Sequence, residues 1–281
     1  MELEMKIHMR VHAAPKHGRN LHGTMTEDVI AHSSSHARPF VAVVADGHGD
    51  PGVNKETYAL ARYVACELRD RADAPAVDSC EVINRNVSKL FARSKAGAVA
   101  TRVKITENEL NVLFLGDCRF YQFTPDGARA FERMTEDHHP DHPEEFRRLS
   151  PRVYPLMEDS AFFFLPVRGT PNRLARVYKD EFGRTHIRGL CVTRSFGDPE
   201  MSPLVTCVPE VKTFSLDSSK RHLFALCSDG GADIVECAFV AACEFKSVSL
   251  DKFLHLVQMY TPTEPSDDVT IMLIELTPDT A

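Results

Sequence analysis

The chain has 281 residues, of which 43% are hydrophobic and 26% charged, and its formal net charge is −7 at pH 7. That length can bury a large core, and no apolar run approaches the ~18 residues of a membrane span. The negative charge argues against a nucleic-acid partner, because phosphate contacts require a basic surface. We therefore expect one monomeric globular domain over residues 1–281, with neither a membrane nor a nucleic-acid partner.

The N-terminal residues 1–10 mix acidic and basic side chains and lack the apolar stretch of a secretory signal. Eight cysteines lie mostly inside apolar runs, without a CxxC pair and without a Cys/His cluster at zinc spacing. We interpret them as reduced, buried thiols. These features predict a cytoplasmic location and do not separate it from a nuclear one.

Short apolar runs of strand length recur along the chain, bounded by Gly, Pro, Asp or charged residues. The expected strands are residues 39–45, 98–105, 110–115, 120–124, 212–214, 223–227 and 269–276. Apolar residues at helical spacing predict helices over 55–71, 80–95, 233–242 and 250–260. The helices come in pairs and do not alternate with strands, which favours a layered α+β fold over a doubly wound parallel sheet.

The middle stretch, about residues 150–188, is irregular in pattern, charged and rich in Pro and Arg. We expect a surface flap or insertion there. The last residues, 277–281, are expected to be a frayed tail.

Four apolar runs meet an acidic residue at one end, usually with glycine beside it. Asp46-Gly47, Gly116-Asp117 and Asp229-Gly230-Gly231 each follow such a run, and Asp267-Asp268 precedes one. Carboxylates at strand ends stand on a rigid frame, and glycine lets a bound ion come close to the backbone. Mg²⁺ and Mn²⁺ prefer carboxylate, carbonyl and water oxygens. One Asp-Gly alone is better explained as a turn, but four together indicate a site for a hard cation.

A family resemblance rests on a longer series of motifs. They are Glu27-Asp28, Asp46-Gly47-His48-Gly49, Gly116-Asp117-Cys118-Arg119, residues 189–198, Val208-Pro209-Glu210-Val211, Asp229-Gly230-Gly231-Ala232-Asp233 and Asp267-Asp268-Val269-Thr270. Residues 135–138, followed by Glu145 and Arg148, form a further match. In order and rough spacing the series resembles the metal-dependent serine/threonine protein phosphatases of type 2C, over about residues 20–275.

The resemblance implies two antiparallel β-sheets packed as a sandwich and flanked by helix pairs, an α-β-β-α arrangement of four layers. It places a site for two Mn²⁺ or Mg²⁺ ions at one edge of the sandwich. The implied reaction is hydrolysis of phosphoserine and phosphothreonine monoesters in a phosphoprotein, by direct attack of metal-activated water.

The resemblance also assigns the metal ligands. Asp46 would bridge both ions, Asp229 and Asp267 would complete one site, and Glu27 with the Gly47 carbonyl would complete the other.

Other residues receive supporting roles. Asp28 would act indirectly or through water, and Asp117 and Asp233 match positions for a third, weakly bound ion. His48 would give the leaving serine or threonine oxygen its proton. The alternative is that His48 is a turn histidine that only hydrogen-bonds a neighbouring carboxylate, and the context favours the acid role.

This sequence departs from the family pattern on the substrate side. Gly23 stands where the family has a phosphate-holding arginine, and Arg19 or His22 are candidate substitutes. The family's Gly-Ser-Thr-Ala strand is represented by Gly97-Ala98-Val99-Ala100, which removes a hydroxyl near the metal pocket. Phe114 and Asp50 replace an asparagine and a glycine of the pattern. The metal ligands are retained and the phosphate-holding groups are altered.

Two other functions compete with a metal-dependent phosphatase. A metal-binding pseudophosphatase would recognise a phosphoprotein without turning it over, but it has no evident reason to keep mutually repelling carboxylates together. A cysteine phosphatase built on Cys118-Arg119 would need an arginine about six residues beyond the thiolate, and no such pattern is present.

Overall fold

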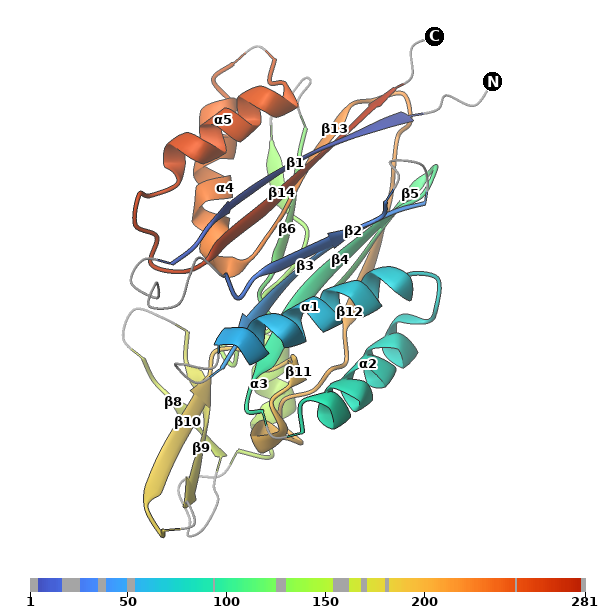
Figure 1. The fold of residues 1–281 in the computed structure, drawn as a ribbon. Coiled ribbons are helices and arrows are strands. Elements are labelled where there is room, and N and C mark those ends of the chain that lie inside the picture. Colours follow the sequence, from blue (N-terminus) through green and yellow to red (C-terminus); the bar gives the residue numbers. More distant parts are fainter. Residues whose placement is uncertain are drawn as a thin grey trace.

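The computed structural model describes residues 5–16, 26–34, 39–49, 54–92, 94–124, 130–153, 162–167, 171–179, 182–245 and 247–278. Two antiparallel sheets form its centre (Figure 1). The first sheet has the order β1-β14-β13-β6-β7, with bounds Met5–Ala14, Val269–Pro278, His222–Cys227, Arg119–Phe123 and Phe131–Arg133. The second sheet has the order β12-β5-β4-β3-β2, with bounds Glu210–Ser215, Glu109–Leu115, Gly97–Ile105, Phe40–His48 and Val29–His32. The short strand β11 (Phe196–Gly197) also pairs with β4.

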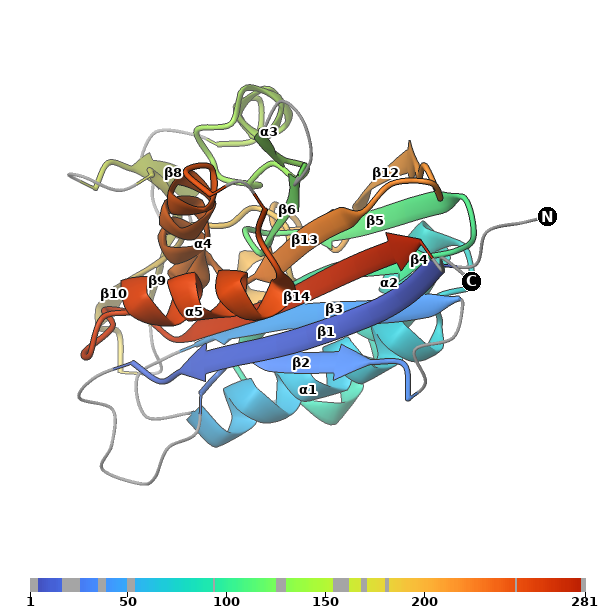
Figure 2. The same ribbon diagram turned by 90° about the horizontal axis from the view of Figure 1, so that it is seen from above.

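The two sheets pack face to face, and a helix pair covers each outer face (Figure 2). Helices α1 (Asn54–Asp70) and α2 (Ala76–Leu90) pack on the second sheet. Helices α4 (Asp229–Ala242) and α5 (Leu250–Tyr260) pack on the first. This arrangement is the expected α+β fold with four layers.

The central strands are apolar throughout because both of their faces are buried. In β3, Phe40, Ala42 and Val44 enter the core between the sheets, whereas Val41 and Val43 face α1 and α2. The same alternation divides β13 between the core and the α4–α5 layer. Since side chains alternate along a strand, a continuous apolar run is what a strand sandwiched between two layers requires.

All seven expected strands and all four expected helices are present, with shifted ends. Helix α2 begins at Ala76 and ends at Leu90, before the predicted 80–95, and α4 begins already at Asp229. Strand β1 was not predicted from the sequence, although Met5 and Ile7 alternate with exposed residues in the manner of a strand. It completes the first sheet by pairing with β14 over its whole length.

Part of the segment 150–188 is regular, contrary to the expectation of irregular structure. Strands β8 (Phe162–Leu165), β9 (Arg173–Lys179) and β10 (Thr185–Leu190) form a small antiparallel sheet of their own, beyond the end of the sandwich. Only Leu174 and Ala175 of these strands are buried. A sheet that is mostly half-exposed needs no strong apolar alternation, so the sequence pattern did not reveal it. Residues 154–161, 168–170 and 180–181 lie outside the described part.

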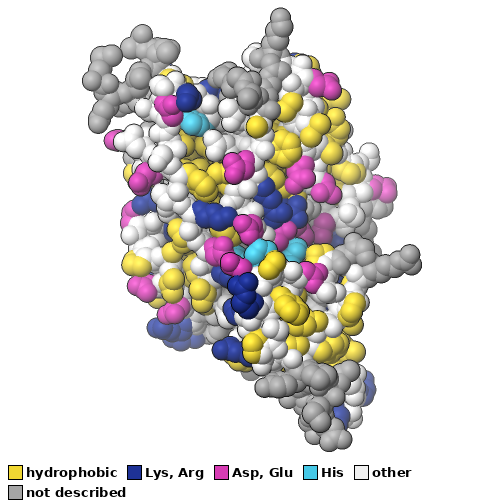
Figure 3. All heavy atoms as spheres, turned by 180° about the vertical axis from the view of Figure 1, so that it is seen from behind, with side chains coloured by type: hydrophobic (Ala, Val, Ile, Leu, Met, Phe, Trp, Pro, Cys, Tyr) yellow, Lys and Arg dark blue, Asp and Glu magenta, His cyan; other side chains and the backbone are white. Residues whose placement is uncertain are grey.

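Among the described residues, the helices are all too short or too polar to traverse a lipid bilayer. On the face seen in Figure 3, acidic, basic and histidine side chains gather near the middle, with apolar side chains scattered around them. The charges on this face are therefore of mixed sign.

A buried carboxylate fixes the short helix α3 (Pro143–Leu149) to the loop that follows β10. The side chain of Glu145 is 1% exposed. It accepts hydrogen bonds from Thr193 Oγ1 at 2.6 Å, from Arg148 Nη2 at 2.7 Å and from Arg194 Nε at 2.9 Å. Burial alone would raise the pKa of Glu145, but these donors outweigh it and lower the pKa to about 2.

We expect Glu145→Gln to lower the free energy of unfolding by about 3 kcal/mol at pH 7, because it leaves two arginines facing a neutral group. A depressed pKa stabilises the fold above the ordinary glutamate value, and this contribution is lost as the pH falls from about 4.5 through about 2. Urea unfolding at pH 7 and pH 3 measures both effects, with the adjacent exposed Glu144→Gln as the control. Equal unfolding curves for the two variants at pH 7 would contradict this assignment.

Candidate active site

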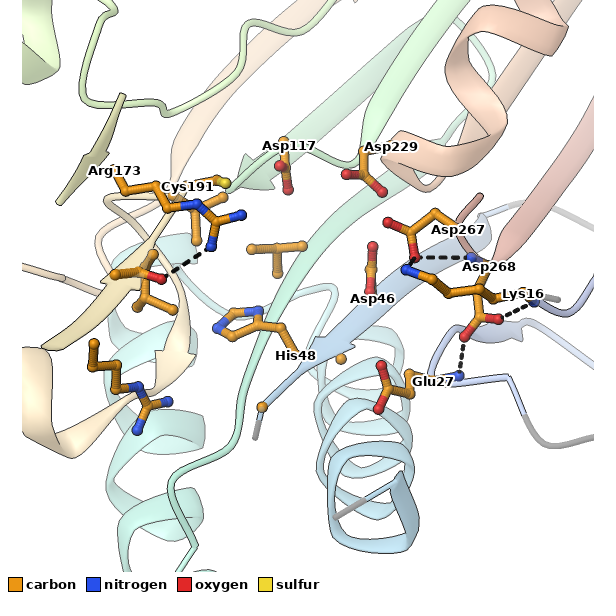
Figure 4. A pocket seen from close by; sticks show the side chains of 17 residues that line it. Lys16, Glu27, Asp46, His48, Asp117, Arg173, Cys191, Asp229, Asp267 and Asp268 are labelled. Atoms are coloured by element: carbon orange, nitrogen blue, oxygen red, sulfur yellow. Dashed lines mark hydrogen bonds and ion pairs between the residues drawn. The ribbon is translucent and has the colours of Figure 1, made fainter. Parts of the chain in front are cut away.

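A pocket of about 320 Å³ opens at one end of the sandwich, beside the small sheet (Figure 4). Strand β3 enters it, and residues at the ends of β13 and β14 border it. Six acidic residues line the pocket: Glu27, Asp46, Asp117, Asp229, Asp267 and Asp268. His48 and the basic residues Lys16, Arg173 and Arg188 also line it. The sequence predicts that four carboxylates from distant parts of the chain meet. All four line this pocket: Glu27, Asp46, Asp229 and Asp267.

Asp46 lies near the end of β3, at the centre of the acidic cluster. Burial raises the pKa of Asp46 well above its ordinary value, and the negative charges of Asp28, Asp229, Asp117 and Asp267 raise it further. The next residue has no room for a side chain, since a Cβ on Gly47 would lie 2.8 Å from Thr57 Cγ2. Glycine therefore lets α1 pack directly against the backbone beside Asp46.

Asp229 opens α4, and its Oδ1 accepts the backbone N–H of Gly230 at 2.6 Å. Burial, followed by the charges of Asp117 and Asp267, raises the pKa of Asp229 to about 7. Asp267 lies just before β14, with its Oδ1 3.5 Å from the Lys16 ammonium. The two aspartates thus meet because β13 and β14 are neighbours in one sheet.

Asp268 has a structural role at the site that the sequence analysis missed. Its Oδ2 accepts the backbone N–H of Glu27 at 2.8 Å, and its Oδ1 accepts that of Lys16 at 2.7 Å. Glu27 in turn accepts the Gly47 N–H through its own carbonyl at 3.3 Å. Asp268 therefore holds Glu27 against the end of β3. The only sequence signal was a second acid at the start of a strand.

Asp28 lies behind the pocket and is 4% exposed. Neither of its carboxylate oxygens forms a hydrogen bond of good geometry with a described residue, although the nearby side chains of Ser228 and Thr270 act to lower its pKa. Burial is the main reason why the pKa of Asp28 is raised to about 7, with the charge of Asp268 adding to it. A buried carboxylate with so few donors is costly when charged, and a cation bound nearby would offset that cost.

The residues fit divalent cations in donor chemistry. Within the described part of the chain, no three His, Cys, Asp or Glu side chains stand in the arrangement of a formed metal site. The pocket nevertheless gathers several carboxylate oxygens. The raised pKa values of Asp46 and Asp229 indicate an excess of negative charge there. Carboxylate oxygens are ligands that Mg²⁺ and Mn²⁺ prefer, and such an ion would offset this charge.

His48 forms an ion pair that the sequence did not predict. Its Nε2 lies 2.6 Å from Oδ2 of Asp198, which comes from the loop after β11, 150 residues further along the chain. Ser195 Oγ donates to the same oxygen at 2.6 Å, and Arg188 Nη2 lies 3.2 Å from Oδ1. Burial opposes protonation of the imidazole, yet the charge and hydrogen bond of Asp198 raise the pKa of His48 overall.

Two backbone features make this pair possible. Gly97 faces His48 across β3 and β4, and a Cβ there would lie 2.0 Å from Asp198 Oδ2 and 2.4 Å from His48 Nε2. Asp198 itself has a left-handed backbone with φ of 49°, a conformation that aspartate tolerates better than most residues. Such a backbone is common where a side chain must be aimed at a functional site.

Residues 4–240 match the model of the protein phosphatase 2C family. The chain belongs to the protein phosphatase 2C family. It is similar to "Probable protein phosphatase 2C 74" of Oryza sativa subsp. japonica, with 29% identity over 184 residues, which are 65% of this chain and 41% of that protein. The chain therefore spans less than half the length of that curated relative.

Solved structures share the fold at low sequence identity. The serine-threonine phosphatase 2C from Toxoplasma gondii matches with a TM-score of 0.66 and 16% identity, over 97% of this chain and 95% of that one. The serine/threonine phosphatase Stp1 from Staphylococcus aureus matches with a TM-score of 0.60 and 17% identity, over 98% and 96%. Members of this family are protein phosphatases, which are hydrolases of phosphoproteins.

The two residues assigned to a third ion in this family do not meet in the pocket. Asp117 lines it but pairs with His139 Nε2 at 3.2 Å. Burial raises the pKa of Asp117, whereas His139, His48 and Arg119 together lower it below its ordinary value. Asp233 is exposed on α4, one turn after Asp229, and is absent from the pocket lining.

Some departures from the 2C-family pattern are visible in the structure. Val99 lines the pocket, so the lost hydroxyl is replaced by an apolar wall. Phe114 is buried and stacks on His138 with ring centroids 5.3 Å apart. Gly23, with Arg19, His22 and Asp50, lies outside the described residues.

Cys118 is no nucleophile. It is 2% exposed, and burial with four neighbouring aspartates raises the pKa of its thiol well above the ordinary value. Arg119 pairs with Asp137, with 2.9 Å between Nη2 and Oδ2. A cysteine phosphatase needs the opposite, an exposed thiolate beside a free arginine.

We expect the metal-free protein to become less stable as the pH rises from about 4 through about 7. The raised pKa values of Asp28, Asp46 and Asp229 mean that the folded chain retains protons that the unfolded chain releases. At pH 7.5 in chelator, Asp46→Asn should therefore be more stable than the parent by about 1 kcal/mol or more, since one pKa unit corresponds to about 1.4 kcal/mol. Mn²⁺ should stabilise only the parent.

Thermal unfolding between pH 5 and 8 tests this prediction, with the exposed Asp251→Asn as the control. Parallel curves for the parent and Asp46→Asn would show that the pocket carboxylates do not repel one another as described.

Proposed function

We propose that this chain is a Mn²⁺- or Mg²⁺-dependent phosphatase of phosphoserine and phosphothreonine in proteins. The observation that carries the proposal is the convergence of Glu27, Asp46, Asp229 and Asp267 on one pocket that also contains His48. Membership of the protein phosphatase 2C family supports the same reaction.

In this proposal the carboxylates hold two divalent cations. Asp46 is central to the cluster and is suited to bridge them, with Asp229 and Asp267 on one side and Glu27 with the Gly47 carbonyl on the other. Bound cations of this kind lower the pKa of a coordinated water and offset the charge of a phosphoryl group. Asp268 keeps Glu27 in place, and Asp28 adds negative charge from behind.

We propose that the active protein binds two metal ions. Asp117 is already paired with His139, and Asp233 is exposed outside the pocket lining, so a third ion would be bound weakly.

His48 is placed to give a proton to the leaving oxygen. Its side chain is 25% exposed at the pocket, while Nε2 is fixed by Asp198, whose side chain is fully buried. The carboxylate holds the ring in one orientation and favours the protonated form, which is the form an acid needs. Serine and threonine are poor leaving groups, so the proton matters most for the natural class of substrate.

Replacing the metal ligands tests the site. We expect Asp46→Asn and Asp229→Asn to lower kcat/KM for a phosphopeptide by at least about 10³-fold, because each removes negative charge from the proposed ion sites. The measurement is phosphate release with Mn²⁺, with Mg²⁺ and with chelator, beside the exposed control Asp251→Asn. Turnover by the parent that is insensitive to chelator would exclude the proposed function.

Replacing the acid should depend on the leaving group. We expect His48→Gln and Asp198→Asn to lower kcat for a phosphoserine peptide by about 10²-fold and about 10-fold, and kcat for p-nitrophenyl phosphate by much less. Nitrophenolate is a stable anion and leaves without being protonated, whereas the serine oxygen needs a proton as its bond to phosphorus breaks.

The control is Asp73→Asn, which is remote from the pocket and pairs with Lys104. Equal losses on the two substrates would mean that His48 has no acid role.

A further inference from the structure

A phosphate ester that enters this pocket meets a strong excess of negative charge. Six acidic residues line the pocket, against three basic ones, Lys16, Arg173 and Arg188. Two divalent cations would compensate most of this charge, but the phosphoryl oxygens that face away from them still need a donor. Gly23 at the family's arginine position cannot supply one. Two of the three basic residues are engaged by other groups, and one is not.

Arg188 is committed to structure. Its Nη2 lies 3.2 Å from Asp198 Oδ1 and its Nη1 lies 3.1 Å from Glu200 Oε2, and it also donates to the Lys95 carbonyl. Its side chain is 10% exposed. A guanidinium with two carboxylate partners and a carbonyl has few donors left for a ligand.

Lys16 is placed on the metal side of the pocket. Its ammonium is 3.5 Å from Asp267, a proposed ligand, and its backbone N–H is bound by Asp268. A cation bound at Asp267 would repel this ammonium, so Lys16 is a poor partner for a phosphate that is held by the same cation.

Arg173 differs from both. It opens β9 on the small sheet and reaches into the pocket from the side opposite Lys16 (Figure 4). Within the described part of the chain, its guanidinium donates one hydrogen bond, from Nη1 to the Gly189 carbonyl at 3.3 Å. No carboxylate of the described residues forms an ion pair with it. Most of its five N–H donors are thus available to a ligand.

The neighbouring strand is shaped to let Arg173 lie in this position. A Cβ on Gly189 would come within 3.3 Å of both Cβ and Cδ of Arg173. Gly189 belongs to β10 and itself lines the pocket, so its missing side chain leaves space for the Arg173 stem. This packing aims the guanidinium at the pocket.

We infer that Arg173 binds the phosphoryl oxygens of the substrate and takes the place of the arginine missing at position 23. The inference rests on the proposed phosphatase function and adds the residue that selects a phosphate dianion. A guanidinium matches two phosphate oxygens at once, and a charged hydrogen bond of this kind accounts for about 10- to 100-fold in affinity. The small sheet then carries a substrate-binding group, separate from the metal ligands on the sandwich.

The test compares Arg173→Gln and Arg173→Lys with Arg184→Gln. Arg184 immediately precedes β10 of the same small sheet, is exposed and is outside the pocket lining, so it controls for the lost charge. In the presence of Mn²⁺, Arg173→Gln should raise the dissociation constant of inorganic phosphate, measured by calorimetry, and the KM of a phosphopeptide by about 10- to 100-fold. For Arg173→Lys, both constants should lie between those of the parent and those of Arg173→Gln. Lysine keeps the positive charge but cannot bind two phosphate oxygens at once as a guanidinium does. Arg184→Gln should stay within about twofold.

A milder variant keeps the test valid if Arg173→Gln does not fold. Gly189→Ala retains the guanidinium but displaces it, and a rise in the phosphate dissociation constant of about threefold or more would support the inference. Phosphate affinity that is unchanged in Arg173→Gln would overturn it, and so would an equal loss of Mn²⁺ affinity, which would make the arginine a structural element of the pocket. Calorimetric phosphate binding is measurable even if the parent has no metal-dependent turnover, so failure of the inference and failure of the proposed function give different results.

Discussion

Repulsion among crowded carboxylates is the constraint on which this end of the molecule depends. Asp28, Asp46 and Asp229 all have raised pKa values, and neither carboxylate oxygen of Asp28 forms a hydrogen bond of good geometry with a described residue. A fold tolerates such a cluster only if rigid elements on every side hold it together. Here the sandwich does so, because the ends of β3, β13 and β14 are fixed by two sheets and the helices outside them.

Much of this arrangement follows from local sequence. The continuous apolar runs in β3 and β13 predict strands that are buried on both faces, and an acid at the end of each predicts a cluster once the strands share a sandwich. The metal ligands could be named because each belongs to a short motif. Their meeting in one pocket required the order of strands in the sheets, which only the family resemblance supplied.

The features that were missed depend on contacts between distant residues. His48 and Asp198 are 150 positions apart, and only the pairing of β3 with β4 and of β4 with β11 brings them together. The small sheet was missed because its strands are mostly half-exposed and so carry no clear apolar alternation. Strand β1 has a readable alternation at Met5 and Ile7, but the rest of the strand is half-buried or exposed.

The Asp268 carboxylate binds the backbone at two points, Lys16 and Glu27, between which ten residues stand in the sequence. One side chain therefore fixes the backbone at both points, whatever residues stand between them. Because the entropy of closing a loop grows only slowly with its length, residues can be added or exchanged between the two points at small cost. Glu27 would keep its position throughout such changes. The sequence between these two points can thus diverge, as Gly23 in place of the family's arginine illustrates, while the carboxylates of the pocket keep their positions.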